Sequence, residues 1–91
     1  MLRPIESSKF RKDLKRARRR GKDLEKLKTP VGLLLAQKPL PERYRDHRLA
    51  GPYAGYRDCH IEPDWLLIYK VDLQGGTLTL VRTGTHADLF R

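Results

Sequence analysis

The chain has 91 residues, 38% of them hydrophobic and 34% charged, which is the balance of a globular protein and not of a disordered one. No apolar run approaches the ~20 residues that a membrane-spanning helix requires, and the N-terminal segment lacks the apolar core of a secretory signal. The single cysteine, Cys59, excludes an internal disulfide framework. We therefore expect one cytoplasmic domain covering residues 1–91.

The net charge of +9 is unevenly distributed. Residues 1–30 carry 12 Lys and Arg against 4 Asp and Glu, an excess of +8. Residues 31–91 carry 8 against 7, an excess of +1. A basic run is often only a solvated helix surface, but an excess this one-sided favours a polyanionic partner, either nucleic acid or an acidic protein.

The N-terminal segment predicts a short strand followed by a helix. Leu2–Ile5 reads as an edge strand because Pro4 cannot donate a backbone hydrogen bond. Ser7 or Ser8 caps a helix that ends at Gly21, which follows a run of arginines suited to the negative end of the helix dipole. The apolar positions that repeat along this helix are Phe10, Leu14 and Ala17.

A second helix is predicted from Asp23, and Pro30 interrupts it. Either the helix kinks at Pro30, or Thr29 caps a new segment that has Pro30 at its first position. The apolar stripe stays in phase through the proline, so we favour one kinked helix. That stripe consists of Leu24, Leu27, Val31 and Leu34.

The rest of the chain predicts strands separated by turns, after an extended connector at residues 38–42. Residues 85–91 predict one helical turn. Because the helices come before the strands, we expect an α+β fold in which a two-helix hairpin packs on one face of an antiparallel sheet and leaves the other face free. The strands are predicted at Tyr44–Leu49, Tyr56–Ile61, Trp65–Val71 and Thr77–Thr83.

All three histidines lie among these strand signals. Alternation along residues 56–62 puts His60 on one face together with Tyr56, Asp58 and Glu62, opposite Cys59 and Ile61. Neighbouring strand ends can bring four polar groups into one pocket, and the segment RDHRLAG adds His47 upstream. The four groups are His60, Asp64, Arg82 and His86.

These residue types suit the cleavage of RNA through its 2′-hydroxyl. Histidine can take or give a proton near neutral pH, arginine can grip a phosphate with two donors, and Asp64 can orient a histidine or act as a base. Each residue also has a structural explanation, and Trp65 fits a core or pocket wall better than a base-stacking platform. The histidine spacings match no compact zinc motif, so we expect no metal and no cofactor.

Three segments of the chain resemble the YafQ family of bacterial toxins, within the RelE/ParE superfamily. They are KDLKRARRRGKDLEKLK, RDHRLAGPYAGYRDCHIEPDWLLIYK and VRTGTHADLF. The similarity runs from the first helix to the C-terminus. Its most specific parts are the GYRD-x-H-x-EPDW-x-LIY block and the RTGTH-x-x-LF ending, which occur in order at matching spacing.

The resemblance implies a RelE-like toxin domain that cuts mRNA in the A site of the small ribosomal subunit and is neutralised by a cognate antitoxin protein. It implies no metal, no membrane association, and the 2′-hydroxyl as nucleophile. On the matching positions, the catalytic set is His47, His60, Asp64, Arg82 and His86. We expect His86 to be the acid and Asp64 or His60 the base.

Substrate contacts follow from the same resemblance. Trp65 and Phe90 shape the site near the nucleotide, and we interpret Arg18, Arg19 and Arg20 as contacts to ribosomal RNA. Arg91 either adds a phosphate contact or trails into solvent. Two other functions stay open: a ParE-like inhibitor that binds a topoisomerase without catalysis, and a plain RNA- or ribosome-binding module.

Overall fold

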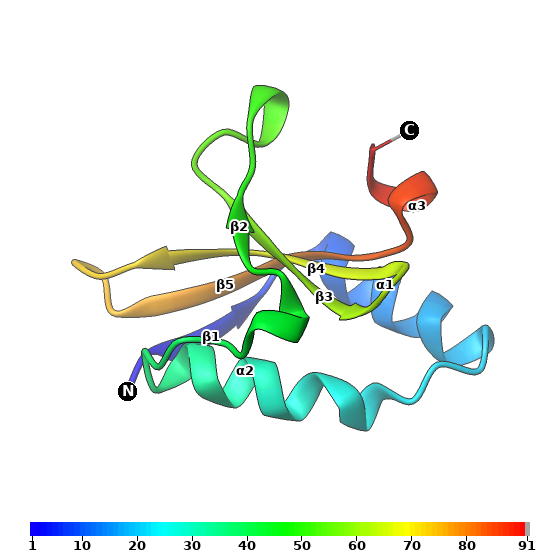
Figure 1. Cartoon of the computed structure of the whole chain (residues 1–91), viewed down its shortest axis with the longest axis horizontal. Coiled ribbons are helices and arrows are strands. Elements are labelled where there is room, and N and C mark those ends of the chain that lie inside the picture. The colour runs from blue at the N-terminus through cyan, green and yellow to red at the C-terminus, as the bar shows by residue number, and fades with distance from the viewer. Residues whose placement is uncertain (91) are drawn as a thin grey trace.

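The computed structural model describes residues 1–90, so Arg91 and its expected phosphate contact lie outside the described residues. One five-stranded sheet carries helices on both faces (Figure 1). The strands are β1 (Arg3–Glu6), β2 (His47–Arg48), β3 (Arg57–Glu62), β4 (Trp65–Asp72) and β5 (Thr77–Gly84). The α-helices are α1 (Ser8–Arg19), α2 (Lys28–Leu35) and α3 (His86–Phe90). Short 3₁₀ helices are η1 (Leu24–Leu27), η2 (Glu42–Tyr44) and η3 (Gly51–Tyr53).

The strand order is β1-β5-β4-β3-β2, and the predicted α+β fold is confirmed. Strands β2 to β5 form the expected antiparallel meander. Strand β1 pairs parallel with β5, which makes the sheet mixed, because no hairpin turn links these two strands and fixes their direction. The strand expected at Tyr44–Leu49 is wrong over most of its length: η2 ends at Tyr44, Arg45 is left-handed at φ 48°, and only His47 and Arg48 pair.

The start and end of α1 agree with the sequence signals. Ser7 is the cap, and its hydroxyl oxygen accepts the Phe10 backbone N–H at 2.9 Å. Gly21 follows the helix with φ 81°, a conformation that glycine adopts without strain. The buried face of α1, which includes Phe10 and Ala17, lies against the sheet, and its basic face points outward.

The second helical segment changes type instead of kinking at its proline. Asp23 caps the 3₁₀ helix η1, which leads directly into α2 at Lys28. Pro30 is buried in the first turn of α2, where backbone N–H groups have no intrahelical acceptor, so the lack of an N–H breaks no helix hydrogen bond. The favoured single kinked helix is therefore wrong. A new helical segment begins, as in the alternative, but its cap is Leu27 and not Thr29. The apolar stripe is confirmed by burial of Leu27 and Leu34.

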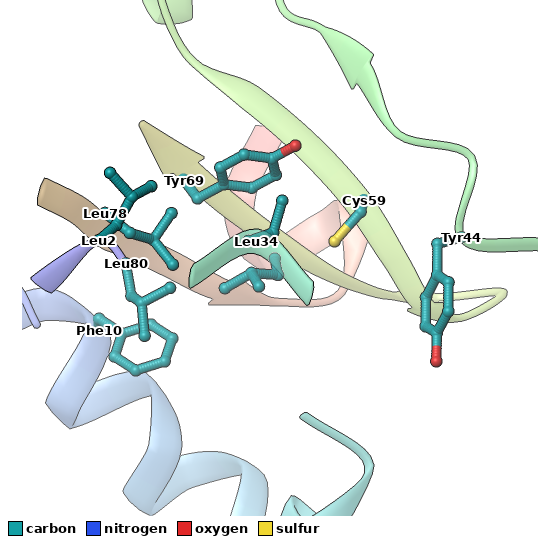
Figure 2. Packing of buried hydrophobic residues seen from close by; sticks show 9 residues of the cluster. Leu2, Phe10, Leu34, Tyr44, Cys59, Tyr69, Leu78 and Leu80 are labelled. Atoms are coloured by element: carbon teal, nitrogen blue, oxygen red, sulfur yellow. The ribbon is translucent and has the colours of Figure 1, made fainter. Parts of the chain in front are cut away.

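The main core lies between the sheet and the α1–α2 hairpin (Figure 1). Figure 2 shows Phe10 of α1 beside Leu80, while Tyr44 stands apart near the end of β3. Cys59 is fully buried here, and burial raises the pKa of its thiol to about 12, so it acts as a small core residue.

The opposite face of the sheet is not free, as the sequence led us to expect. A second apolar cluster covers part of it, formed by Leu66 and Ile68 of β4 and Leu89 of α3. In Figure 1, α3 and the η3 loop stand on this side, away from α1 and α2. None of the helices within residues 1–90 has the length and apolarity needed to cross a membrane.

Candidate active site

Three histidines lie in a row on the face opposite the main helices. The ring centroids of His47 and His60 are 6.3 Å apart, and those of His60 and His86 are 5.6 Å apart. The sheet register explains this row, because His60 is paired with Leu66, and Leu66 is paired with Gly84, two residues before His86. Strand β2 supplies His47 from the other side. The structure therefore brings all three predicted histidines together.

Asp64 fixes the orientation of His86. Its Oδ1 accepts the backbone N–H of His86 at 2.9 Å and lies 2.6 Å from the ring Nδ1. The backbone hydrogen bond first, and the ring contact second, lower the pKa of Asp64 below its ordinary value. A carboxylate oxygen only accepts, so Nδ1 of His86 carries a proton and Nε2 is the atom left for chemistry.

His47 is oriented in the same sense by a backbone carbonyl. Its Nδ1 lies 2.7 Å from the carbonyl oxygen of Arg45, which cannot donate, so this nitrogen also carries the proton. Asp46 holds the start of β2 in place through hydrogen bonds from Arg57 and from the Tyr69 hydroxyl. The left-handed turn at Arg45 thus leaves Nε2 as the ring nitrogen of His47 that the backbone does not engage.

A buried carboxylate, Asp58, lies beneath this row and is missing from the predicted set. It is only 3% exposed, and its Oδ1 lies 3.1 Å from Nδ1 of His47 yet accepts no hydrogen bond within residues 1–90, because that N–H points at Arg45. Burial raises the pKa of Asp58, while the charges of His47, His60 and His86 act against that rise. The alternation that placed Asp58 on the His60 face was the signal that could have identified it.

Arg82 lies at the edge of the sheet beyond the last residue of β1, and a carboxylate holds it there. Its Nε and Nη2 donate to the buried Asp13 of α1 at 2.7 and 3.2 Å, and these bonds raise the pKa of Arg82. Asp13 also accepts the Thr83 backbone N–H at 3.1 Å. Two of the five guanidinium donors are thereby used. No side-chain hydrogen bond within residues 1–90 joins Arg82 to a histidine.

The arginine run at the end of α1 divides into two parts. Arg20 Nη1 donates to Asp88 of α3 at 2.7 Å, and this bond lowers the pKa of Asp88. Asp88 in turn forms a reciprocal capping pair with Thr85, so α1 anchors the helix that carries His86. Arg18 and Arg19 are exposed and form no ion pair within residues 1–90.

The two aromatic residues expected near a nucleotide differ in exposure. Trp65 is 1% exposed and donates from Nε1 to the Thr83 hydroxyl at 2.8 Å, so it supports the site from within the core. Phe90 is 46% exposed and meets Tyr53 edge-on with centroids 5.7 Å apart. Phe90 lies one helical turn after His86, on the same side of α3. Phe90 is therefore the exposed aromatic surface beside the histidines.

No group of three or more His, Cys, Asp or Glu side chains within residues 1–90 is arranged to hold a metal ion. The three imidazoles are spread in a row, and two of them already have their Nδ1 protons directed at oxygen acceptors. Imidazoles with one ring nitrogen left unengaged are suited to proton transfer.

A family model described as the bacterial toxin of a type II toxin–antitoxin system, YafQ, matches residues 2–91. The chain belongs to the YafQ family. It is 52% identical over 85 residues to the mRNA interferase toxin YafQ of Escherichia coli K12, covering 92% of this chain and 90% of that one. The resemblance inferred from the sequence motifs is thus confirmed.

Solved structures of bacterial toxins agree with the fold over nearly its whole length. In a crystal structure of the E. coli DinJ–YafQ complex, the chain is 47% identical to this one, with a TM-score of 0.89 and complete coverage of both chains. A metal-bound toxin from Helicobacter pylori is 46% identical, with a TM-score of 0.93, covering 99% of this chain and 100% of that one.

Proposed function

We propose that this YafQ-family protein is an endoribonuclease, the toxin of a type II pair, which cleaves mRNA in the ribosomal A site and so stops translation. Its E. coli relative, 52% identical, is named an mRNA interferase toxin, which assigns the enzyme class. The observation that carries the mechanism is the row of His47, His60 and His86, spaced at 6.3 and 5.6 Å beside the carboxylate of Asp64. Proton-transfer groups gathered in this way suit phosphodiester cleavage by side chains alone.

In the proposed reaction the ribose 2′-oxygen attacks the adjacent phosphorus and the bond from phosphorus to the 5′-oxygen breaks. A base takes the 2′-proton, and His86 gives its proton to the leaving 5′-oxygen. The products are a 2′,3′-cyclic phosphate and a 5′-hydroxyl. Arg82 offsets the charge that develops on the phosphate, with Asp13 holding it in position.

The contacts of Asp64 favour His60 as the base over Asp64 itself. Oδ1 of Asp64 already accepts two N–H groups of His86, which is the geometry of an orienting carboxylate. Such a carboxylate stabilises the imidazolium from which an acid must start. His60 lies between the other two rings and is the nearest imidazole to His86. His47, whose Nδ1 is held by the Arg45 carbonyl, presents Nε2 and can support or replace it.

The partners follow from charge and from the relatives. Exposed Arg18 and Arg19 fit the ribosomal RNA backbone, which supplies affinity without sequence choice. The E. coli relative forms a complex with DinJ, so we propose that this chain has a cognate antitoxin protein as well. Action on ribosomes places the protein in the cytoplasm.

Primer extension on a defined mRNA in a translation reaction tests the function. Wild type is expected to cut at fixed codon positions, and His86→Ala to bind ribosomes without cutting. A single 2′-deoxy nucleotide at a mapped cut is expected to abolish that cut alone, and the products should carry cyclic phosphate ends. Growth arrest without any cuts would favour the topoisomerase-binding alternative. Equal toxicity of His86→Ala and wild type would favour a plain ribosome binder.

A further inference from the structure

A large cavity lies beside the histidine row and shares only His60 with the residues assigned to the reaction. Its volume is about 550 Å³, within the range of roughly 300–1,000 Å³ that small-molecule sites occupy. Its walls come from three parts of the chain: the η1–α2 segment, the turn at η2 and the end of β3. The residues used below are Lys26, Arg43, Tyr44, Arg45, His60 and Glu62.

The charge of this cavity selects an anion. The cavity is lined by three basic side chains and by one carboxylate, that of Glu62. The basic side chains are those of Lys26, Arg43 and Arg45. That carboxylate is already engaged, because Lys22 and Lys26 donate to it at 2.8 and 2.7 Å and lower its pKa. The two arginines form no ion pair within residues 1–90, so their charge faces the cavity uncompensated.

The backbone and an aromatic ring hold these arginines at the cavity wall. Arg43 lies over the Tyr44 ring at 4.7 Å and donates to its hydroxyl at 3.3 Å. Figure 2 shows that ring beside the end of β3, the strand that carries His60. Arg45 directs its carbonyl to His47 in the left-handed turn, so one residue both orients a site histidine and lines the cavity.

We propose that this cavity is a subsite for the RNA nucleotide one position beyond the two that flank the scissile phosphate, with Arg43 and Arg45 binding the phosphate that joins it to them. The inference rests on the proposed function and extends it. His60 belongs both to the cavity wall and to the histidine row, so an RNA strand cut at the row has its next nucleotide at the cavity mouth. Guanidinium groups grip a phosphate with two donors, and the volume accommodates the sugar and base.

Short uncleavable RNAs test the subsite on the free protein. Each carries a 2′-O-methyl group on the ribose that would be attacked, and a dinucleotide is compared with trinucleotides extended on its 5′ or 3′ side. One extension is expected to tighten binding roughly tenfold, the gain of a charge-assisted phosphate contact. It should also shift the NMR signals of His60 and Arg45, measured at physiological salt.

The double variant Arg43→Gln/Arg45→Gln is expected to abolish the advantage of the extension and to leave dinucleotide binding nearly unchanged. Arg3→Gln/Arg11→Gln is the matched control, because it removes two exposed arginines from β1 and α1. An advantage that survives in Arg43→Gln/Arg45→Gln, or falls equally in the control, would overturn the subsite. The subsite would also be overturned if the trinucleotides bind no better than the dinucleotide and a bound antitoxin covers Arg43 and Arg45 instead.

A separate readout distinguishes failure of the subsite from failure of the proposed function. If wild type cuts no mRNA on ribosomes, the function fails, whereas the oligonucleotide binding still decides the subsite. If wild type cuts, single-turnover rates should show that Arg43→Gln/Arg45→Gln needs more mRNA–ribosome complex for half-maximal rate, with the maximal rate changed little. A lower maximal rate at unchanged half-saturation would place these arginines in the chemical step and overturn a binding subsite.

Discussion

The two faces of the sheet use the same strands for opposite purposes. Toward α1 and α2, side chains such as Leu67 and Leu78 are fully buried in a continuous apolar core. On the other face a smaller apolar cluster around Leu66 and Ile68 adjoins three exposed or half-exposed histidines and the buried carboxylate of Asp58. The first face forms the main core, and the second presents the polar groups that the proposed reaction would use.

The comparison also shows how the second face is kept in order without a large core. Ion pairs from α1 reach past the sheet edge, with Arg20 bound to Asp88 and Asp13 bound to Arg82. Helix α1 therefore contributes an apolar side to the first face and a charged end to the second. Substitutions on the two faces should consequently separate stability from cleavage.

The largest effect is expected at His86, whose ring is half exposed. His86→Gln removes the proposed acid and should lower the single-turnover cleavage rate by roughly 10²–10⁴-fold, the usual worth of general acid–base catalysis. The melting temperature should stay close to that of wild type. Leu67→Ala is the converse control, with a cost of about 2–5 kcal/mol in unfolding free energy and unchanged cleavage by the folded fraction. A large stability loss in His86→Gln would contradict the separation of the faces.

Asp13 should affect both properties, because it links the two faces. Asp13→Asn leaves the half-buried guanidinium of Arg82 without its counter-charge, so we expect a loss of about 1–3 kcal/mol in denaturant unfolding. Cleavage by the remaining folded protein should also fall, since Arg82 is no longer held toward the phosphate. Arg82→Gln, compared in parallel, should lose cleavage with a smaller loss of stability. Full activity in folded Asp13→Asn would show that this anchoring is not needed.

Asp58 is expected to have opposite effects on stability and activity. Its pKa in the folded state is raised above 3.8, so folding takes up a proton and stability is lost as pH rises from that value through the raised pKa. Asp58→Asn removes this penalty and should raise the melting temperature at pH 7 by a few degrees, with the gain vanishing at acid pH. Cleavage should fall several-fold, and its pH profile should change, because the histidines lose a counter-charge. An unchanged pH profile would reduce Asp58 to a structural role.

The comparison of faces explains what the sequence could and could not predict. Strands β3 to β5, the cap at Ser7 and the stop at Gly21 follow from local signals, and each is confirmed. The histidine row depends on the pairing register of the strands. Alternation along β3 determines only the face on which His60 lies, and the left-handed turn at Arg45 determines where His47 lies.

Long-range ion pairs were beyond local prediction altogether. Asp13 and Arg82 are 69 residues apart, and nothing in the pattern of α1 separates Asp13 from a solvent-exposed acid. Arg20 similarly looked like one more member of a basic run. Only the packing of α1 against the end of β5 and α3 assigns these charges to partners.

The smallest effect is expected at Arg20, whose exposed guanidinium pairs with Asp88 of α3 at 2.7 Å, beside a longer pair from Arg16 to Asp88 at 3.7 Å. Arg20→Gln should leave the melting temperature nearly unchanged, because exposed pairs are screened by water and salt. Cleavage should nevertheless fall modestly, since Asp88 anchors the helix that begins at His86, and hydrogen exchange at Leu89 should quicken. Arg19→Gln is the matched control: it lacks the contact to Asp88, so it should weaken ribosome binding without changing exchange in α3. If the two variants behave alike, Arg20 acts through its charge toward RNA and not through α3.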